Sequence, residues 1–173
     1  MSLPWAALTE LPPRGFEPDP APLGFTLPVG PGGYAWWYVD ALSDDGELGL
    51  TIIAFVGSVF SPWYARERRR MRAGGPPALP ERHCAINVAV YRAKGRDVWA
   101  FTEQREFSRD ALHFRLGASE LRWGLDEQGP RLEITIDERT AITGRAIRGR
   151  VVLRPRAIFG PRITLDAGPQ HRG

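Results

Sequence analysis

The segment from Tyr34 to Pro62 constrains the fold more than any other part of the sequence. It contains two runs rich in aromatic and β-branched residues, 34–42 and 48–56, separated by Asp44-Asp45-Gly46. Glycine tolerates the positive φ that a tight hairpin turn requires, so the two runs predict a pair of antiparallel strands. The second run is nearly all apolar, which predicts a strand that is covered on both faces.

The rest of the chain repeats this pattern, because short β-prone runs are separated by Gly, Asp and Pro. Six further strands are expected near 82–91, 97–106, 112–116, 119–123, 131–137 and 147–153. One helix is expected over 62–72, since Pro62 suits a first helical turn and the Gly and Pro residues at 74–77 would end it. The sequence therefore predicts a mainly β protein, an antiparallel barrel or sandwich with one short helix.

Composition favours one folded domain behind a proline-rich lead-in. The 173 residues, 43% hydrophobic and 25% charged, are typical of a single globular domain. Residues 1–33 contain eight prolines, which remove amide donors and oppose both helix and sheet. We therefore expect an extended lead-in over 1–33 and a β-barrel domain over 34–173.

Charge and motifs argue against several classes of function. The net charge is only +3, and the one basic concentration, 66–72, lacks a nucleic-acid-binding motif, so no nucleic-acid partner is expected. The three histidines, His83, His113 and His171, have no paired-ligand spacing, so no metal site is expected. No glycine-rich phosphate loop follows a strand, and we expect no cofactor.

The single cysteine and the lack of long apolar runs indicate where in the cell the protein is expected. Cys84 cannot form an internal disulfide framework, which fits a reducing environment. No export signal and no apolar stretch of about 18 residues is present. We therefore expect a cytoplasmic protein, with a peripheral position on the inner membrane as an alternative.

The first aromatic run carries the main candidates for chemistry. Alternate side chains of a strand share a face, so Trp36, Tyr38 and Asp40 point one way and Trp37 the other. Burial among apolar rings would raise the pKa of Asp40 and make it a candidate proton donor, and aromatic faces stabilise a carbocation. Alternatively, Asp40 closes the strand and pairs with an arginine or turn amides, while the tryptophans belong to the core.

The run 82–91 offers a second set of polar candidates. His83 and Asn87 share one face of the expected strand, and the apolar Cys84 and Ile86 share the other. If the polar face points into a barrel, His83 and Asn87 could hold a water molecule or orient an acid. If it points outward, they are solvated residues.

The expected helix has a composition suited to a membrane interface. Aromatic side chains precede five arginines, and aromatic rings and cations both favour the headgroup region of an anionic bilayer. This predicts reversible membrane contact through Trp63, Tyr64, Arg66, Arg68, Arg69 and Arg70. The alternative is a solvated helix whose aromatic side chains pack on the β domain.

Two long segments of the sequence resemble a known protein family. GGYAWWYVDALSDDG (32–46) and LTIIAFVGSVFSP (50–62) closely resemble the carotenoid 1,2-hydratases, or hydroxyneurosporene synthases, which add water to the terminal double bond of an acyclic carotenoid. Shorter similarities occur at 83–91, 102–105, 136–138 and 149–155. The resemblance implies a lipocalin-like β-barrel, with full-length members built from two such units, and cofactor-free hydration of a neurosporene- or lycopene-type substrate.

The last residues, 165–173, resemble the start of the family's histidine-x-tryptophan motif. This implies that His171 matches a histidine considered catalytic in the family, although Gly173 stands where the tryptophan would be. The family's tyrosine-x-aspartate pair, with its presumed proton donor, would lie further on. We therefore expect a fragment with little activity of its own.

Three functions remain open at this point. In the leading hypothesis, Trp36, Trp37 and Tyr38 line an apolar slot for a long polyene, and His83 and Asn87 are further substrate contacts. A non-catalytic lipocalin-like carrier of a lipid or isoprenoid would use the same slot without an acid. A filled barrel that stabilises a partner would have no slot.

Overall fold

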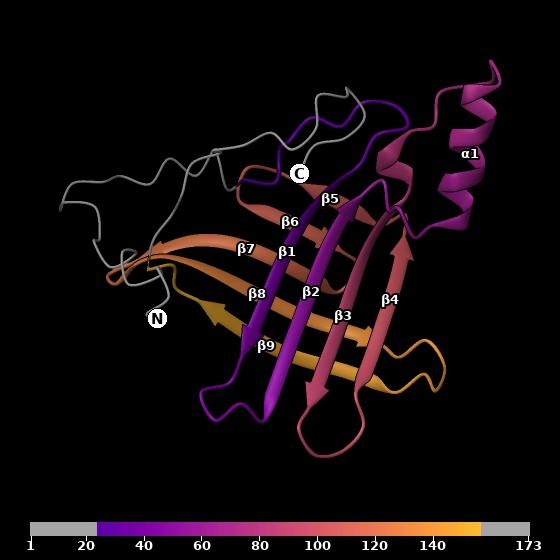
Figure 1. The fold of residues 1–173 in the computed structure, drawn as a ribbon. Coiled ribbons are helices and arrows are strands. Elements are labelled where there is room, and N and C mark those ends of the chain that lie inside the picture. Colours follow the sequence, from indigo (N-terminus) through magenta and orange to yellow (C-terminus); the bar gives the residue numbers. More distant parts are fainter. Residues whose placement is uncertain (1–23, 157–173) are drawn as a thin grey trace, which may run out of the picture.

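The computed structural model describes residues 24–156, which form two antiparallel sheets packed face to face (Figure 1). The first sheet has the order β1 (Ala35–Leu42), β2 (Leu48–Val56), β3 (Cys84–Arg92) and β4 (Val98–Gln104). The second has the order β5 (Phe107–Arg109), β6 (His113–Leu116), β7 (Ser119–Asp126), β8 (Gly129–Arg139) and β9 (Ala146–Leu153). The strands of one sheet cross those of the other steeply in Figure 1, as in orthogonal sheet packing. Of the predicted forms, the described part is a sandwich and not a closed barrel.

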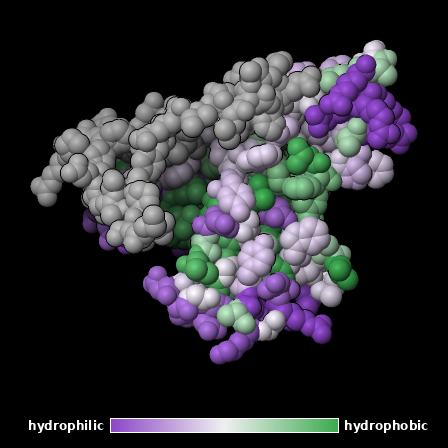
Figure 2. All heavy atoms as spheres, viewed as in Figure 1, coloured by the Kyte–Doolittle hydropathy of each residue, from purple (hydrophilic) through white to green (hydrophobic). Residues whose placement is uncertain are grey.

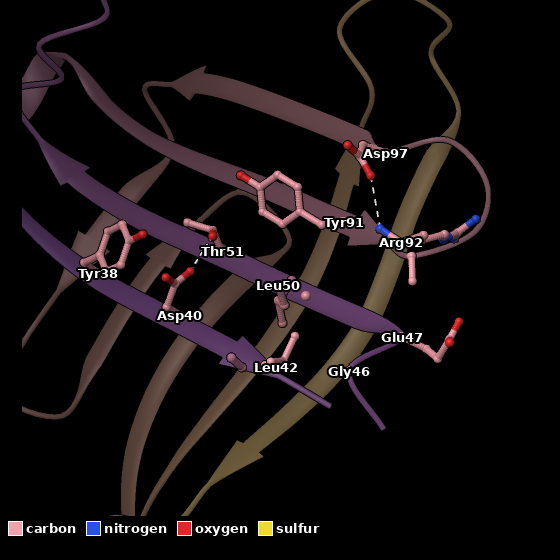
Figure 3. Close-up of a pocket in the computed structure, with 13 residues that line it drawn as sticks. Tyr38, Asp40, Leu42, Gly46, Glu47, Leu50, Thr51, Tyr91, Arg92 and Asp97 are labelled. Atoms are coloured by element: carbon pink, nitrogen blue, oxygen red, sulfur yellow. Dashed lines mark hydrogen bonds between the residues drawn. The ribbon is translucent and has the colours of Figure 1, made fainter. Parts of the chain in front are cut away.

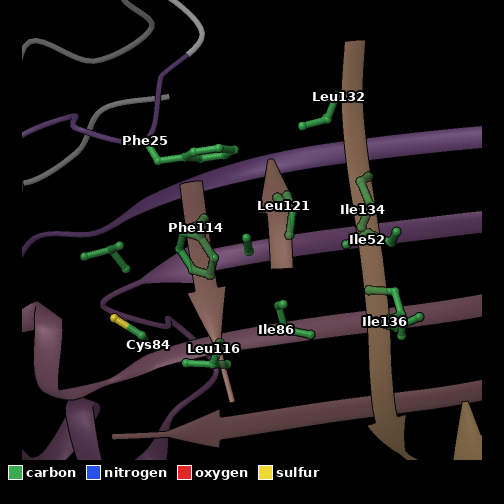
Figure 4. Close-up of a cluster of buried hydrophobic side chains, with 13 residues drawn as sticks. Phe25, Ile52, Cys84, Ile86, Phe114, Leu116, Leu121, Leu132, Ile134 and Ile136 are labelled. Atoms are coloured by element: carbon green, nitrogen blue, oxygen red, sulfur yellow. The ribbon is translucent and has the colours of Figure 1, made fainter. Parts of the chain in front are cut away.

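The hydrophobic core lies between the two sheets (Figure 4). Strand alternation sends Ile52 and Ile86 inward from the first sheet, and Phe114 and Ile134 inward from the second, and all four are fully buried. Phe25, from the segment before β1, closes one end of this core, because its ring lies 6.0 Å from that of Phe114. The apolar alternation in the sequence is thus the pattern of a two-layer core.

One buried carboxylate links the sheets through hydrogen bonds. Glu138 on β8 is almost fully buried and accepts hydrogen bonds from Thr102 on β4 and from Ser119 on β7, the latter at 2.6 Å. An unpaired carboxylate would be costly to bury, so these two hydroxyl groups are needed to keep Glu138 inside. The contact with Thr102 crosses from one sheet to the other.

The helix α1 (Pro62–Arg72) is attached at one end of the first sheet. Its N-cap, Ser61, accepts a hydrogen bond from the Tyr64 amide at 3.1 Å, as capping serines commonly do. The buried Tyr64 hydroxyl donates to the Gly33 carbonyl at 2.5 Å. Gly57, with φ of 71°, is required nearby, because a Cβ there would lie 2.6 Å from the Gly33 carbonyl oxygen.

The structure confirms the predicted strands and the helix 62–72, with two differences. A short 3₁₀ turn, η2 (Pro80–Arg82), delays the start of β3, so His83 precedes that strand. The three-residue strand β5 was not predicted, because a run of three residues carries no clear alternation. Of the expected lead-in, residues 24–33 form neither helix nor strand.

Candidate functional site

The outer face of the four-stranded sheet is rich in aromatic side chains. Trp36 and Tyr38 on β1 are 40% and 56% exposed, and Tyr91 on β3 and Trp99 on β4 are 48% and 49% exposed. Phe101 on β4 points to the same side and is half-buried. We call this surface, defined by these five residues, the aromatic face. In Figure 2 the surface over β1–β4 is mostly pale and green, and the strongly hydrophilic atoms gather at the lower loops and on α1.

Small residues lower the middle of the aromatic face. Across the sheet, Asp40 pairs with Thr51, Thr51 with Ala89, and Ala89 with Trp99. Ala89 points away from the core and is nevertheless buried, because larger neighbours on the adjoining strands stand above it. The result is a shallow trough with aromatic side chains along its edges.

A hollow of about 750 Å³ lies at one end of this trough, around Asp40 (Figure 3). Tyr38, Asp40, Thr51 and Tyr91 line it from three neighbouring strands and lie on the same side of the sheet. The Thr51 hydroxyl donates a hydrogen bond of 2.5 Å to the Asp40 carboxylate. The hollow therefore combines the Asp40 carboxylate, the Thr51 hydroxyl and two phenol rings, with Glu47, Arg92 and Asp97 at its hairpin end.

Asp40 does not have the environment that the sequence suggested. Its side chain is exposed and not buried among apolar rings, because the four-stranded sheet has no layer on this side in the described residues. Within residues 24–156 its side chain is hydrogen-bonded to the Thr51 hydroxyl, and not to an arginine or a turn amide. Desolvation of Asp40 would require something to cover the aromatic face.

Trp37 is part of the core and not of the aromatic face. Its ring lies 5.3 Å from that of Phe25 and 5.7 Å from that of Phe114, and its Nε1 donates to the Gly24 carbonyl at 3.3 Å. This corrects the expectation of one slot lined by Trp36, Trp37 and Tyr38. The second sheet packs on the Trp37 side of β1, so only Trp36 and Tyr38 remain on the open side.

His83 lies in the turn before β3, away from the strand face that the sequence assigned to it. The residue is 7% exposed, and its ring lies against that of Tyr64 at a tilt of 30°, with ring centroids 5.0 Å apart. Its Nδ1 is hydrogen-bonded to Glu103 Oε1 at 2.9 Å. Glu67 Oε2 lies 3.2 Å from Nε2 but out of alignment, so Nε2 has no hydrogen-bond partner among the described residues.

The surroundings of His83 are polar. A second hollow, of about 890 Å³, is lined by Trp63, Glu67, Glu81, Arg82, His83, Glu103, Gln104 and Arg105. Its lining contains one aromatic side chain, Trp63, and lies beside the helix and not on the aromatic face. Glu103 also accepts a hydrogen bond of 2.8 Å from Ser61, so it joins the helix cap to His83. His83 is thus part of the attachment of α1.

Asn87 is on the aromatic face, where it holds a neighbouring ring. Its side-chain oxygen accepts a hydrogen bond from Trp99 Nε1, which fixes the orientation of that indole. Neither Tyr91 nor Trp99 was among the site residues predicted from the sequence. The alternation that marked β1 could have found both, because each lies on the same side of its strand as Asn87 or its pairing partner.

Two buried acidic groups take no part in proton transfer near neutral pH. Burial raises the pKa of the Cys84 thiol to about 12 and that of the Tyr64 hydroxyl to about 12. Both groups therefore stay protonated. In residues 24–156, no group of three or more His, Cys, Asp or Glu side chains is arranged to hold a metal ion.

The fold and site define an antiparallel β-sandwich protein with an open aromatic face. A sequence model described as "Carotenoid hydratase CrtC" matches residues 52–172, and the chain belongs to this family. The chain is 46% identical over 153 residues to the acyclic carotenoid 1,2-hydratase of Rubrivivax gelatinosus, covering 86% of this chain and 35% of that protein.

Two further relatives agree with this assignment. The acyclic carotenoid 1,2-hydratase of Thiocapsa roseopersicina is 45% identical over 161 residues, covering 92% of this chain and 37% of the relative. That of Rhodobacter capsulatus is 38% identical over 120 residues, covering 68% and 38% respectively. The chain thus spans little more than a third of the length of these relatives, and no solved structure matches it significantly. The resemblance seen in the sequence is confirmed.

Proposed function

We propose that this chain takes part in hydrating the terminal C1–C2 double bond of an acyclic carotenoid of the neurosporene or lycopene type. The aromatic face is the observation that carries the proposal. Exposed aromatic side chains from three strands border a trough with small residues along its floor, and such a surface suits an extended, flat hydrocarbon. Membership of the carotenoid hydratase family supports the same substrate class.

The reaction needs a proton, a stabilised cation and water. A proton adds to C2, the tertiary carbocation forms at C1, water attacks C1, and the oxygen then loses a proton. The rings of Trp36 and Tyr38 would stabilise the cation through their negative faces. Net addition of one water molecule requires no redox cofactor.

Asp40 is our candidate for proton donation within the described residues. A hydrocarbon lying on the aromatic face would remove water from Asp40, and loss of water favours the neutral, protonated acid. The Thr51 hydroxyl would keep the carboxyl group oriented. The catalytic role of His171 is proposed from the family resemblance alone, since that residue lies outside the described range.

A carrier of a lipid or isoprenoid is the second candidate function. The specific observation in its favour is that Asp40 is exposed and hydrogen-bonded, which is not the state of a poised acid. A carrier would use Trp36, Tyr38, Tyr91 and Trp99 for binding alone. A purely structural role is less favoured, because these four aromatic side chains are exposed and not buried in a core.

Binding and turnover can be measured separately. The 173-residue chain would be mixed with lycopene in detergent, with tryptophan quenching as the readout for binding and chromatography of the 1-hydroxy product for turnover. Trp36→Ala with Tyr38→Ala should abolish binding, and Asp40→Asn should keep binding and remove product. Arg122→Ala, on the outer face of the other sheet, is the matched control and should change neither.

The outcomes distinguish the candidate functions. Product from the wild-type chain that is lost in Asp40→Asn supports hydration. Binding without product supports the carrier. Absence of binding by the wild-type chain, or equal binding by the Trp36/Tyr38 variant, would contradict both.

A further inference from the structure

The helix α1 uses very little of its surface to pack against the rest of the protein. Of its 11 residues only Tyr64 is buried, and its hydroxyl and ring fasten the helix to Gly33 and His83. The side chains of Trp63, Arg66 and Arg70 are exposed. Packing therefore explains one position of the helix and leaves the composition of its outer surface unexplained.

That outer surface is strongly basic. The helix contains five arginines and one acid, Glu67, which gives a net charge of +4 (5 − 1). Glu67 faces His83, and Arg68 lies over the Tyr64 ring at 5.7 Å. None of the other four helix arginines, at 66, 69, 70 and 72, forms an ion pair with a carboxylate in the part of the chain that the structure describes.

An apolar tip adjoins this basic surface. Phe60 and Trp63, at the start of α1, are both 64% exposed, and Val59 beside them is also exposed. Figure 1 shows the helix projecting from the end of the sandwich, and Figure 2 shows its deep purple atoms beyond the paler sheet surface. We call Val59, Phe60, Trp63 and the arginines at 66, 69, 70 and 72 the basic–aromatic tip.

We propose that the basic–aromatic tip docks this protein on the surface of an anionic lipid bilayer. Arginines near such a surface are attracted by its negative potential, and exposed aromatic side chains enter the headgroup region. Nucleic acid fits less well, because stacking aromatics would be spread along a basic groove, whereas here the aromatics stand together at one end. Within residues 24–156 no helix is long and apolar enough to cross a bilayer.

The docking surface differs from the one that the sequence suggested. Tyr64 is fully buried and cannot reach a bilayer, and the cation of Arg68 is directed to the Tyr64 ring. Phe60 and Arg72 take their places. Which residues can contact a bilayer depends on which helix positions are exposed, and composition alone does not give that.

The tip is also continuous with the aromatic face. The ring of Phe60 lies 6.2 Å from that of Phe101, edge to face. A hydrophobic molecule leaving the bilayer at the tip would therefore meet aromatic side chains leading to the trough. Docking itself does not depend on the proposed hydratase activity and can be tested without it.

The test is co-sedimentation of the full 173-residue chain with phosphatidylcholine vesicles, with and without phosphatidylserine. The wild-type chain should sediment with the anionic vesicles and not with pure phosphatidylcholine. Replacing Arg66, Arg69 and Arg70 with Gln should weaken vesicle binding about a hundredfold, at roughly fivefold for each of the three cations. The matched control replaces Arg115, Arg145 and Arg148 with Gln and changes the net charge equally.

A second variant tests the aromatic part. Trp63→Ala should weaken binding to anionic vesicles several-fold and remove the blue shift in tryptophan fluorescence on vesicle addition. All variants change exposed side chains, and unchanged thermal unfolding would show that they are folded. The proposal is overturned if the two triple variants bind equally, if phosphatidylserine has no effect, or if a DNA duplex displaces the chain from vesicles at equal phosphate concentration.

Discussion

The two sheets have opposite kinds of outer face. On the five-stranded sheet, Glu133 lies between Arg122 at 3.2 Å and Arg150 at 2.9 Å, and Asp137 pairs with Arg148 at 2.9 Å. Every ion pair that joins two strands within residues 24–156 is on this sheet. The four-stranded sheet carries the aromatic face instead.

This difference shows which of the two outer faces is suited to contact with water. Arginine and carboxylate side chains paired across strands are a stable water-facing solution, although each exposed pair contributes little. A group of half-exposed aromatic side chains is a poor water-facing surface and commonly marks a place where something binds. The four-stranded sheet therefore carries the candidate functional surface, and the five-stranded sheet supports it.

The largest effect should come from the core that both sheets share. Phe114→Ala removes a fully buried ring that contacts Phe25, Trp37 and Phe107, and should lower the free energy of unfolding by about 3–5 kcal/mol. Urea denaturation measures this. Leu125→Ala, at an exposed site on the same sheet, is the control, and an equal loss in both variants would show that the buried Phe114 ring stabilises the fold no more than an exposed side chain does.

The polar link between the sheets should rank next. Glu138→Ala leaves the Thr102 and Ser119 hydroxyls without their acceptor and should cost about 2–3 kcal/mol of unfolding free energy. Glu138→Gln keeps one acceptor oxygen and should cost less. If both substitutions were neutral in urea denaturation, the link would be dispensable.

Changing the aromatic face should affect ligand binding far more than stability. Trp36→Gln with Trp99→Gln should alter the free energy of unfolding by less than about 1 kcal/mol, because both side chains are about half exposed and neither belongs to the core between the sheets. The same variant should lose most of the fluorescence of an anilinonaphthalene dye added to the folded chain. A dye signal that survives in the double variant would place the apolar binding surface elsewhere.

The smallest effect should come from acid acting on the ion-paired face. A hydrogen bond from Arg154 lowers the pKa of Asp126 below its usual range. This stabilisation is present above the unfolded-state pKa of about 3.9 and is lost as the pH falls through the lower folded-state value. Asp126→Asn should therefore reduce stability slightly at pH 7 and make no difference at very low pH.

Thermal unfolding of wild type and Asp126→Asn from pH 7 to very low pH measures whether the loss of stability disappears in acid, as expected. Asp44→Asn is the matched control, since Asp44 is an exposed aspartate in the β1–β2 turn. A destabilisation that grows as the pH falls would be opposite to expectation.

Local signals were sufficient for most of the fold. Two-residue alternation located the strands, and Pro62 together with the glycines at 74 and 75 gave the bounds of α1. Alternation also showed that Trp36 and Trp37 face opposite ways. It could not say which one is inside, because that is decided by Phe25 and Phe114, which are distant in sequence.

The candidate site was harder to foresee for the same reason. His83 was assigned to a strand because nothing local distinguishes the turn Pro80–Arg82 from the start of β3. Its contact with Glu103 joins residues 20 positions apart. The exposure of Asp40 depends on the absence of a second layer over β1 in the described residues, which no strand pattern reports.

The Glu138 contacts have a consequence for the geometry of the whole sandwich. Packing between two apolar layers depends on the shapes of the side chains, whereas a hydrogen bond also depends on direction. A carboxylate held by hydroxyls from both layers resists rotation of one layer on the other, because hydrogen bonds weaken when they bend. This buried carboxylate therefore adds to the packing of the core in holding the two sheets at one crossing angle.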